Sequence, residues 1–132
     1  SEQFEARFLS VEVKKNNSLF FDGMENSIIP VVISHGEGRA SFSDENNLIE
    51  MLKNEQITLK FDDKNGTLSY PHNPNGSPDG ITGLSSINGR FTIMMPHPER
   101  NFRSDQNPWR PKNWEEFGPW YRMFANANKY FN

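Results

Sequence analysis

Short β-prone runs separated by turn-forming residues constrain the fold of this 132-residue chain more than any other feature. The clearest turn is Asn88-Gly89, because an Asn-Gly pair between β-prone runs (81–87 and 90–95) is typical of a two-residue hairpin. Near-alternating apolar residues predict another strand over 4–14. Strands and hairpins are therefore expected to make up much of the fold.

Two further segments are predicted strands of different kinds. Residues 28–33 are apolar on both faces, which is typical of a buried strand that pairs in parallel. Residues 57–61 alternate in polarity and are followed by a turn-rich stretch over 62–66. This pattern predicts a second hairpin, whose return strand includes Leu68 and Tyr70. A mixed sheet with hairpins would accommodate all of these segments.

Two amphipathic helices complete the expected elements. Apolar residues at helical spacing predict a short helix over 44–54, with Ser43 as its N-cap. A second helix is expected over 119–131, because Gly118-Pro119 is a favourable helix start, and it should dock through a broad aromatic face. The order of strands, helix, hairpins and final helix indicates α/β architecture, either one domain or the C-terminal part of one.

The composition excludes several classes of site. The chain has no cysteine, so it encodes neither disulfides, nor thiolate zinc ligands, nor a cysteine nucleophile. Its net charge of −3 comes without a dense Lys/Arg patch, which argues against nucleic-acid binding. No apolar run approaches the ~18–20 residues that cross a bilayer. Three histidines without tight ligand spacing predict no metal site, and no glycine-rich phosphate loop indicates a nucleotide site.

Two segments have the form His-x-Glu, and each follows a predicted strand. In His97-Pro98-Glu99, the prolines at 96 and 98 should hold the backbone extended, so that the imidazole and the carboxylate point the same way. A carboxylate that orients an imidazole forms the base half of a nucleophilic triad. The nucleophile is missing, and a surface ion pair is the alternative interpretation.

The other segment, His35-Gly36-Glu37, is followed by Gly38. The two glycines indicate a turn, through positive φ or close backbone approach. Contact with a ligand or an interface is therefore expected here, rather than catalysis.

Aromatic and arginine residues gather near the C-terminus, which is typical either of an interface or of core packing under the last helix. The aromatic members are Phe102, Trp109, Trp114, Phe117, Trp120 and Tyr121.

Four segments together resemble the phosphoribosylformylglycinamidine synthase family (formylglycinamide ribonucleotide amidotransferase). They are PVVISHGEGR (residues 30–39), NPNGS (residues 73–77), GRFTIMMPHPER (residues 89–100) and the Trp-rich end through WYRMF (residues 120–124). The resemblance covers essentially the whole chain and favours the large single-chain form of the enzyme. Glutaminase subunits of other amidotransferases match these segments less well.

The resemblance implies a class I glutamine amidotransferase domain, a three-layer flavodoxin-like α/β fold with a mostly parallel sheet. Residues 1–132 would be its C-terminal fragment, without the upstream strands and the nucleophile elbow. His97 and Glu99 would be the second and third members of a Cys-His-Glu triad. His35, Gly36 and Glu37 would line the glutamine pocket or contact the synthetase region.

The resemblance also implies the setting of the reaction. Glutamine would be the ammonia donor in a cytoplasmic ligase of purine biosynthesis. ATP and Mg²⁺ would bind the synthetase region of the parent chain, and this fragment would hold no cofactor. Alone it should be inactive, because it lacks the cysteine, and it should self-associate through exposed strand edges. The alternative function is an independently folded interaction module without catalytic activity.

Overall fold

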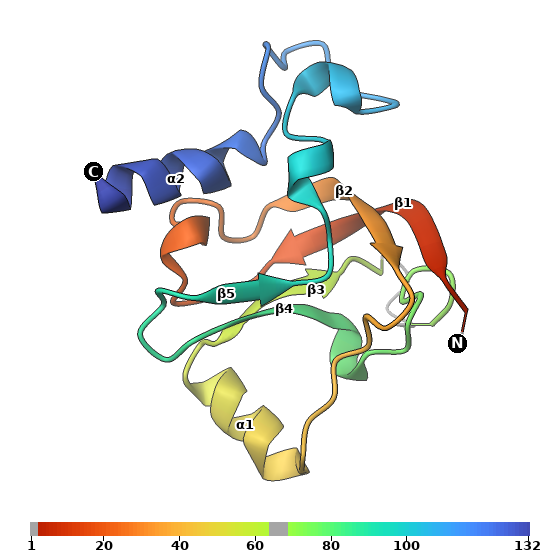
Figure 1. Ribbon diagram of the computed structural model, residues 1–132, viewed down its shortest axis with the longest axis vertical. Coiled ribbons are helices and arrows are strands. Elements are labelled where there is room, and N and C mark those ends of the chain that lie inside the picture. Colours follow the sequence, from red (N-terminus) through yellow and green to blue (C-terminus); the bar gives the residue numbers. More distant parts are fainter. Residues whose placement is uncertain (1–2, 64–68) are drawn as a thin grey trace.

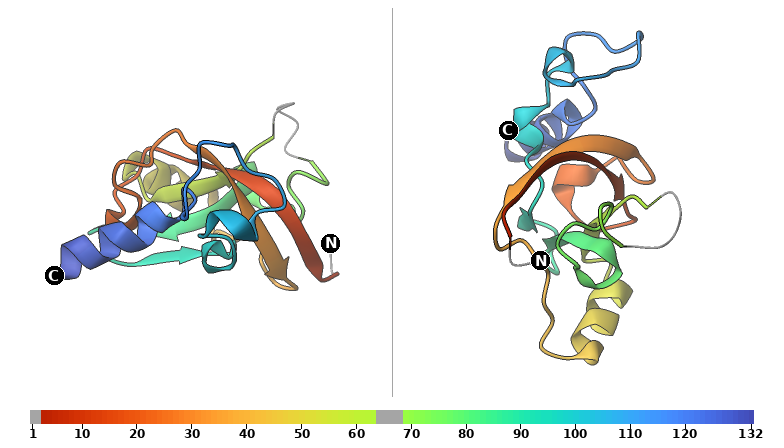
Figure 2. Two further views of the ribbon diagram at one scale, coloured as in Figure 1. Left: turned by 90° about the horizontal axis from the view of Figure 1, so that it is seen from above. Right: turned by 90° about the vertical axis from the view of Figure 1, so that its right-hand side faces the viewer.

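A five-stranded antiparallel sheet forms the centre of the computed structural model, which describes residues 3–63 and 69–132. The strands lie in the order β2-β1-β3-β4-β5. Figure 2 shows that β1 and β2 curl over the short turn η1. The elements are β1 (Glu5–Val13), η1 (Leu19–Phe21), β2 (Ile28–His35), α1 (Glu45–Lys53), β3 (Ile57–Phe61), η2 (Pro78–Gly80), β4 (Ile81–Ser85), β5 (Thr92–Met94), η3 (Pro98–Arg100), η4 (Ser104–Gln106) and α2 (Tyr121–Phe131).

The β2 strand forms where it was expected, but it pairs antiparallel with β1, so the parallel arrangement predicted for it is wrong. Its inward face carries the buried residues Ile29, Val31 and Ile33, while Pro30 and Val32 between them are partly exposed. The segment after β5 covers the outer edge of β2, where the backbone carbonyl of Pro30 accepts hydrogen bonds from Asn101 Nδ2 and Trp120 Nε1.

The hairpin at Asn88-Gly89 is confirmed: it joins β4 to β5, and Gly89 has a φ of +71°. The strand expected over 57–61 is also confirmed, but β3 pairs with β1 and β4. The return strand predicted near Tyr70 falls partly outside the described residues, since 64–68 are not described. Residues 70–75, which the structure does describe, form turns and bends instead.

Both predicted helices are confirmed, with two differences. Asp44, rather than Ser43, caps α1, because its Oδ1 accepts from the Asn47 backbone N–H at 2.9 Å. The apolar face of α1 does not dock on the sheet: Ile49 and Leu52 are 57% and 46% exposed. Figure 1 shows α1 at one end of the molecule, opposite α2.

The hydrophobic core lies between the curled sheet, η1 and the start of α2. Val11 and Val31 from the sheet meet Phe21 of η1, and Trp120, immediately before α2, is fully buried. The aromatic face of α2 is only partly covered, since Phe124 and Phe131 are 39% and 59% exposed. Within the described residues, none of the helices is long and apolar enough to cross a bilayer.

The two outer edges of the sheet differ. The β2 edge is covered by the segment after β5, whereas, among the residues that the structure describes, β5 pairs with β4 alone. Phe91 and Ile93 beside that edge are 72% and 68% exposed. The self-association expected through strand edges therefore stays a prediction, and β5 is the edge on which it would occur.

Candidate functional site

The hydrogen-bonded His–Glu pair predicted from the sequence is present in the structure. His97 Nδ1 lies 2.8 Å from Glu99 Oε1, and the His97 backbone N–H donates to the Val32 carbonyl at 2.8 Å. The backbone differs from the extended geometry that was expected, because Pro98 begins the 3-10 turn η3. Proline favours the first position of such a turn, and the turn carries Glu99 back toward the imidazole.

The second nitrogen of the His97 ring also faces an acceptor. His97 Nε2 lies 3.2 Å from the carbonyl oxygen of Ser34, next to the end of β2. A neutral imidazole has one N–H, so only the imidazolium can donate to both Glu99 and Ser34. The geometry therefore suits a ring that takes up a proton and passes it on.

In the second His-x-Glu segment, the backbone at Gly38 passes close to the ring of His35. A Cβ placed on Gly38 would lie 2.5 Å from His35 Nδ1, so only glycine fits beneath the ring in this conformation. The expected positive φ is absent from Gly36 and Gly38, so close approach, rather than backbone handedness, explains the glycine at 38. His35 Nε2 lies 3.5 Å from Asn75 Nδ2.

The surroundings of His35 connect the two His-x-Glu segments. Burial is the main reason why the pKa of His35 is lowered. A hydrogen bond to its own backbone and the charge of Glu5 oppose the shift, and the charge of His97 adds a smaller lowering. The contact between His97 Nε2 and the Ser34 carbonyl, one residue before His35, brings these histidines, which are 62 positions apart in sequence, to one end of the sheet. The lowered pKa of His35 favours its neutral form.

A pocket of about 260 Å³ opens beside His35. Sequence analysis missed two of its polar residues. Glu5 of β1 is only 8% exposed and its carboxylate lies 2.5 Å from Arg7 Nη2, while Asn75 belongs to the NPNGS segment. The hydrogen bond to Tyr70 is the main reason why the pKa of Arg7 is raised, and Glu5 adds to it. The lining residues are Gln3, Glu5, His35, Gly36, Glu37, Gly38, Arg39 and Asn75.

Glu5 carries no sequence signal, since it occupies an ordinary strand position. Asn75 could be found only through the NPNGS segment, which the family resemblance singles out.

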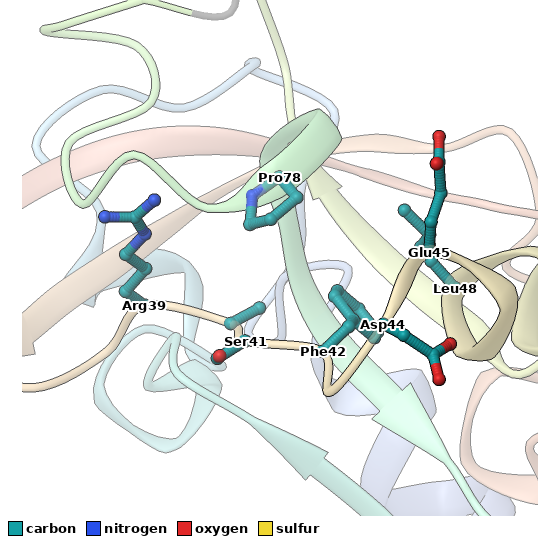
Figure 3. Close-up of a pocket in the computed structure, with 8 residues that line it drawn as sticks. Arg39, Ser41, Phe42, Asp44, Glu45, Leu48 and Pro78 are labelled. Carbon is teal, nitrogen blue, oxygen red and sulfur yellow. The ribbon is translucent and has the colours of Figure 1, made fainter.

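A second, more open pocket of about 530 Å³ lies between the 39–45 loop, α1 and Pro78. Figure 3 shows Arg39 toward one end of it and the carboxylates of Asp44 and Glu45 toward the other. Neither histidine lines this pocket, so its chemistry is separate from that of the His97–Glu99 pair.

The aromatic segment near the C-terminus divides into core and surface. Trp120 is fully buried, whereas Trp109 is 75% exposed. Phe117 stacks on Tyr121 with ring centroids 4.1 Å apart, and both remain partly exposed. Core packing therefore explains Trp120, and the interface interpretation stays a prediction for the exposed aromatics.

Among the residues that the structure describes, no group of three His, Cys, Asp or Glu side chains could hold a metal ion.

Comparisons with known proteins bear on the fold and the family of this chain. The PurLQS structure from Thermotoga maritima is similar, with a TM-score of 0.69 at 21% sequence identity, a likeness that shows the fold. The match covers 99% of this chain and 50% of that one, so the chain spans half the length of this relative. The family model for CobB/CobQ-like glutamine amidotransferase domains matches residues 1–131. The chain therefore belongs to the CobB/CobQ-like glutamine amidotransferase domain family.

Proposed function

We propose that this chain supplies the acid–base part of the glutaminase site of phosphoribosylformylglycinamidine synthase. The observation that carries the proposal is the 2.8 Å hydrogen bond between His97 Nδ1 and Glu99 Oε1, in a chain of the glutamine amidotransferase domain family. Residues 1–132 would be the C-terminal part of that domain. The fold of the PurLQS relative, whose chain is twice as long, supports this assignment.

Glutamine hydrolysis needs a nucleophile, which these 132 residues do not encode, because they contain no cysteine. A cysteine from another part of the parent protein would attack the side-chain amide carbon of glutamine as a thiolate. The imidazolium of His97 would give its proton to the leaving amide nitrogen, which releases ammonia and leaves a glutamyl thioester. His97 would then accept a proton from water as the water hydrolyses that thioester.

Glu99 would hold His97 in one orientation and stabilise the imidazolium. The contact between His97 Nδ1 and Glu99 Oε1 supports this role for the carboxylate. Nε2, on the opposite side of the ring, would face the nucleophile and substrate once it leaves the Ser34 carbonyl. His35, Gly36 and Glu37 would line the glutamine pocket or contact the synthetase region, since they border the adjacent 260 Å³ pocket.

The ammonia would pass within the parent protein to its synthetase region. There it would displace the activated amide oxygen of formylglycinamide ribonucleotide and form the amidine. ATP activates that oxygen in the presence of Mg²⁺, and we assign both to the synthetase region. The chain itself has no glycine-rich phosphate loop, and its described residues bring no three metal-ligating side chains together. Such a ligase of purine biosynthesis would work in the cytoplasm.

The test is a His97→Ala variant of the intact parent enzyme. We expect glutamine-dependent amidine formation to fall by roughly 10²- to 10⁴-fold, because general acid–base catalysis is lost. Synthesis from free ammonium salts should be retained, since it bypasses glutamine. Loss of both activities would assign His97 a structural role and refute the proposal.

A further inference from the structure

We propose that Asn75 is a positioning residue of the glutaminase site, which holds the 35–40 loop so that His35 stays beside His97. The inference rests on the proposed function and extends it to a residue outside the His-x-Glu segments. It is carried by a set of buried hydrogen bonds that join residues 37 positions apart in two loops.

Two hydrogen bonds tie the 73–77 loop to the 35–40 loop. Asn75 Nδ2 donates to the Gly38 carbonyl at 2.7 Å, and Ser77 Oγ accepts from the Ala40 backbone N–H at 2.9 Å. Asn75 and Ser77 are 6% and 2% exposed, so water does not compete effectively for these contacts. A buried amide that lost its partner would remain unsatisfied, which makes the connection costly to break.

The orientation of the Asn75 amide is determined by its own loop. Asn75 Oδ1 accepts from the Ser77 backbone N–H at 3.1 Å and from Ser77 Oγ at 2.7 Å. Asn73 Nδ2 donates to the Ser77 carbonyl at 2.9 Å and braces the same turn. With the oxygen engaged by Ser77, the NH₂ group must point toward Gly38 and His35.

The His35 ring is thereby held between two groups. Gly38 lies beneath it, close enough that a Cβ would collide with the ring, and Asn75 Nδ2 lies 3.5 Å from Nε2. An amide NH₂ directed at Nε2 favours the neutral ring, with its proton on Nδ1. The other groups whose charge acts on His35 are Glu5 from β1 and His97 from the segment after β5.

This arrangement connects Asn75 to the proposed chemistry. His97 Nε2 contacts the carbonyl of Ser34, the residue directly before His35. Movement of the 35–40 loop would therefore disturb both the pocket lining and the immediate surroundings of the proposed acid–base residue. Asn75 would act through these groups, without touching the reacting atoms.

The experiment compares Asn75→Ala with Asn126→Ala in the intact parent enzyme. Asn126 is a matched control, because it is 8% exposed and its Nδ2 bonds two backbone carbonyls, those of Phe20 and Asp22 on the η1 side of α2. We expect Asn75→Ala to lower glutamine-dependent kcat/KM about tenfold more than Asn126→Ala does. A tenfold loss is the size expected when a few hydrogen bonds that position the site are removed. Ammonia-dependent synthesis should be unchanged in both. Equal losses in the two variants would overturn the proposal.

A second variant covers the case in which Asn75→Ala disturbs folding. Asn75→Asp keeps the shape and the acceptor for Ser77 but replaces the NH₂ donor with a carboxylate oxygen. By NMR on the 132-residue chain, His35 should then protonate at higher pH than in the unmodified chain, while the β1 and β2 resonances stay in place. An unchanged His35 titration would refute the positioning role. Failure of the proposed function would be seen separately, as glutamine-dependent activity retained by His97→Ala.

Discussion

The two His-x-Glu segments of this chain have the same spacing but different local structures. In His97-Pro98-Glu99, proline starts a 3-10 turn and the carboxylate bonds its own histidine at 2.8 Å. In His35-Gly36-Glu37, the histidine ring packs over Gly38, and the amide Nδ2 of Asn75 lies 3.5 Å from its Nε2. The difference teaches that the residues between and around a motif decide which partner its histidine takes. Proline yields a self-contained pair, whereas glycine lets a distant loop supply the partner.

The largest expected difference between the two segments is in the effect of removing the carboxylate charge. Glu99→Gln in the intact enzyme should lower glutamine-dependent kcat by roughly 10²- to 10⁴-fold, because the amide cannot stabilise the imidazolium as a carboxylate does. Glu37→Gln should cost less than about tenfold, since Glu37 is exposed and does not orient a histidine in this way. Steady-state kinetics with glutamine would measure both. Equal effects would mean that the 2.8 Å pair is not what distinguishes the segments.

A smaller effect is expected from filling the space beneath His35. In Gly38→Ala the new methyl group would collide with the ring, so either the ring or the loop must move, at a cost of about 1–3 kcal/mol in the free energy of unfolding. Denaturant unfolding of the 132-residue chain would measure this cost. Gly76→Ala is a useful contrast, because its Cβ would meet no atom within 4 Å and only its φ of +68° opposes the change. A neutral Gly38→Ala would contradict the close approach described for His35.

The smallest expected effect is a pH dependence of stability that comes from His35. Its pKa is lowered in the folded chain, chiefly by burial, so the unfolded chain binds the proton more readily. The free energy of unfolding should therefore fall as the pH drops below about 6.5, the ordinary pKa of histidine. His35→Gln should remove this part of the acid destabilisation. Unfolding curves at about pH 7.5 and about pH 5 would show it, and an identical pH slope in both proteins would exclude His35 as its source.

Much of the fold could be predicted from local patterns. Periodicity and turn chemistry within short stretches of sequence predict the Asn88-Gly89 turn, the strands β1 and β3, and both helices. The pairing direction of β2 could not be predicted in that way. Its outer edge is covered by Asn101 and Trp120, which follow Pro30 by 71 and 90 positions and donate to its backbone carbonyl.

The candidate site shows the same division. The His97–Glu99 pair could be predicted because both residues and the prolines that shape the turn are neighbours in sequence. The roles of Glu5 and Asn75 could not, because they depend on which loops the sheet brings to one end. The identity of a residue alone does not show which residue of a remote loop will contact it.

The double hydrogen bond to the Pro30 carbonyl has a consequence for how the chain is made. The donors Asn101 and Trp120 follow Pro30 by 71 and 90 positions. At about 5–20 residues per second, a ribosome needs on the order of 5–20 seconds between β2 and the indole that caps it. During that interval the Pro30 carbonyl at the outer edge of β2 lacks its indole donor. Trp120 therefore completes the cover of an edge on which intermolecular sheets could otherwise form, as well as completing the core.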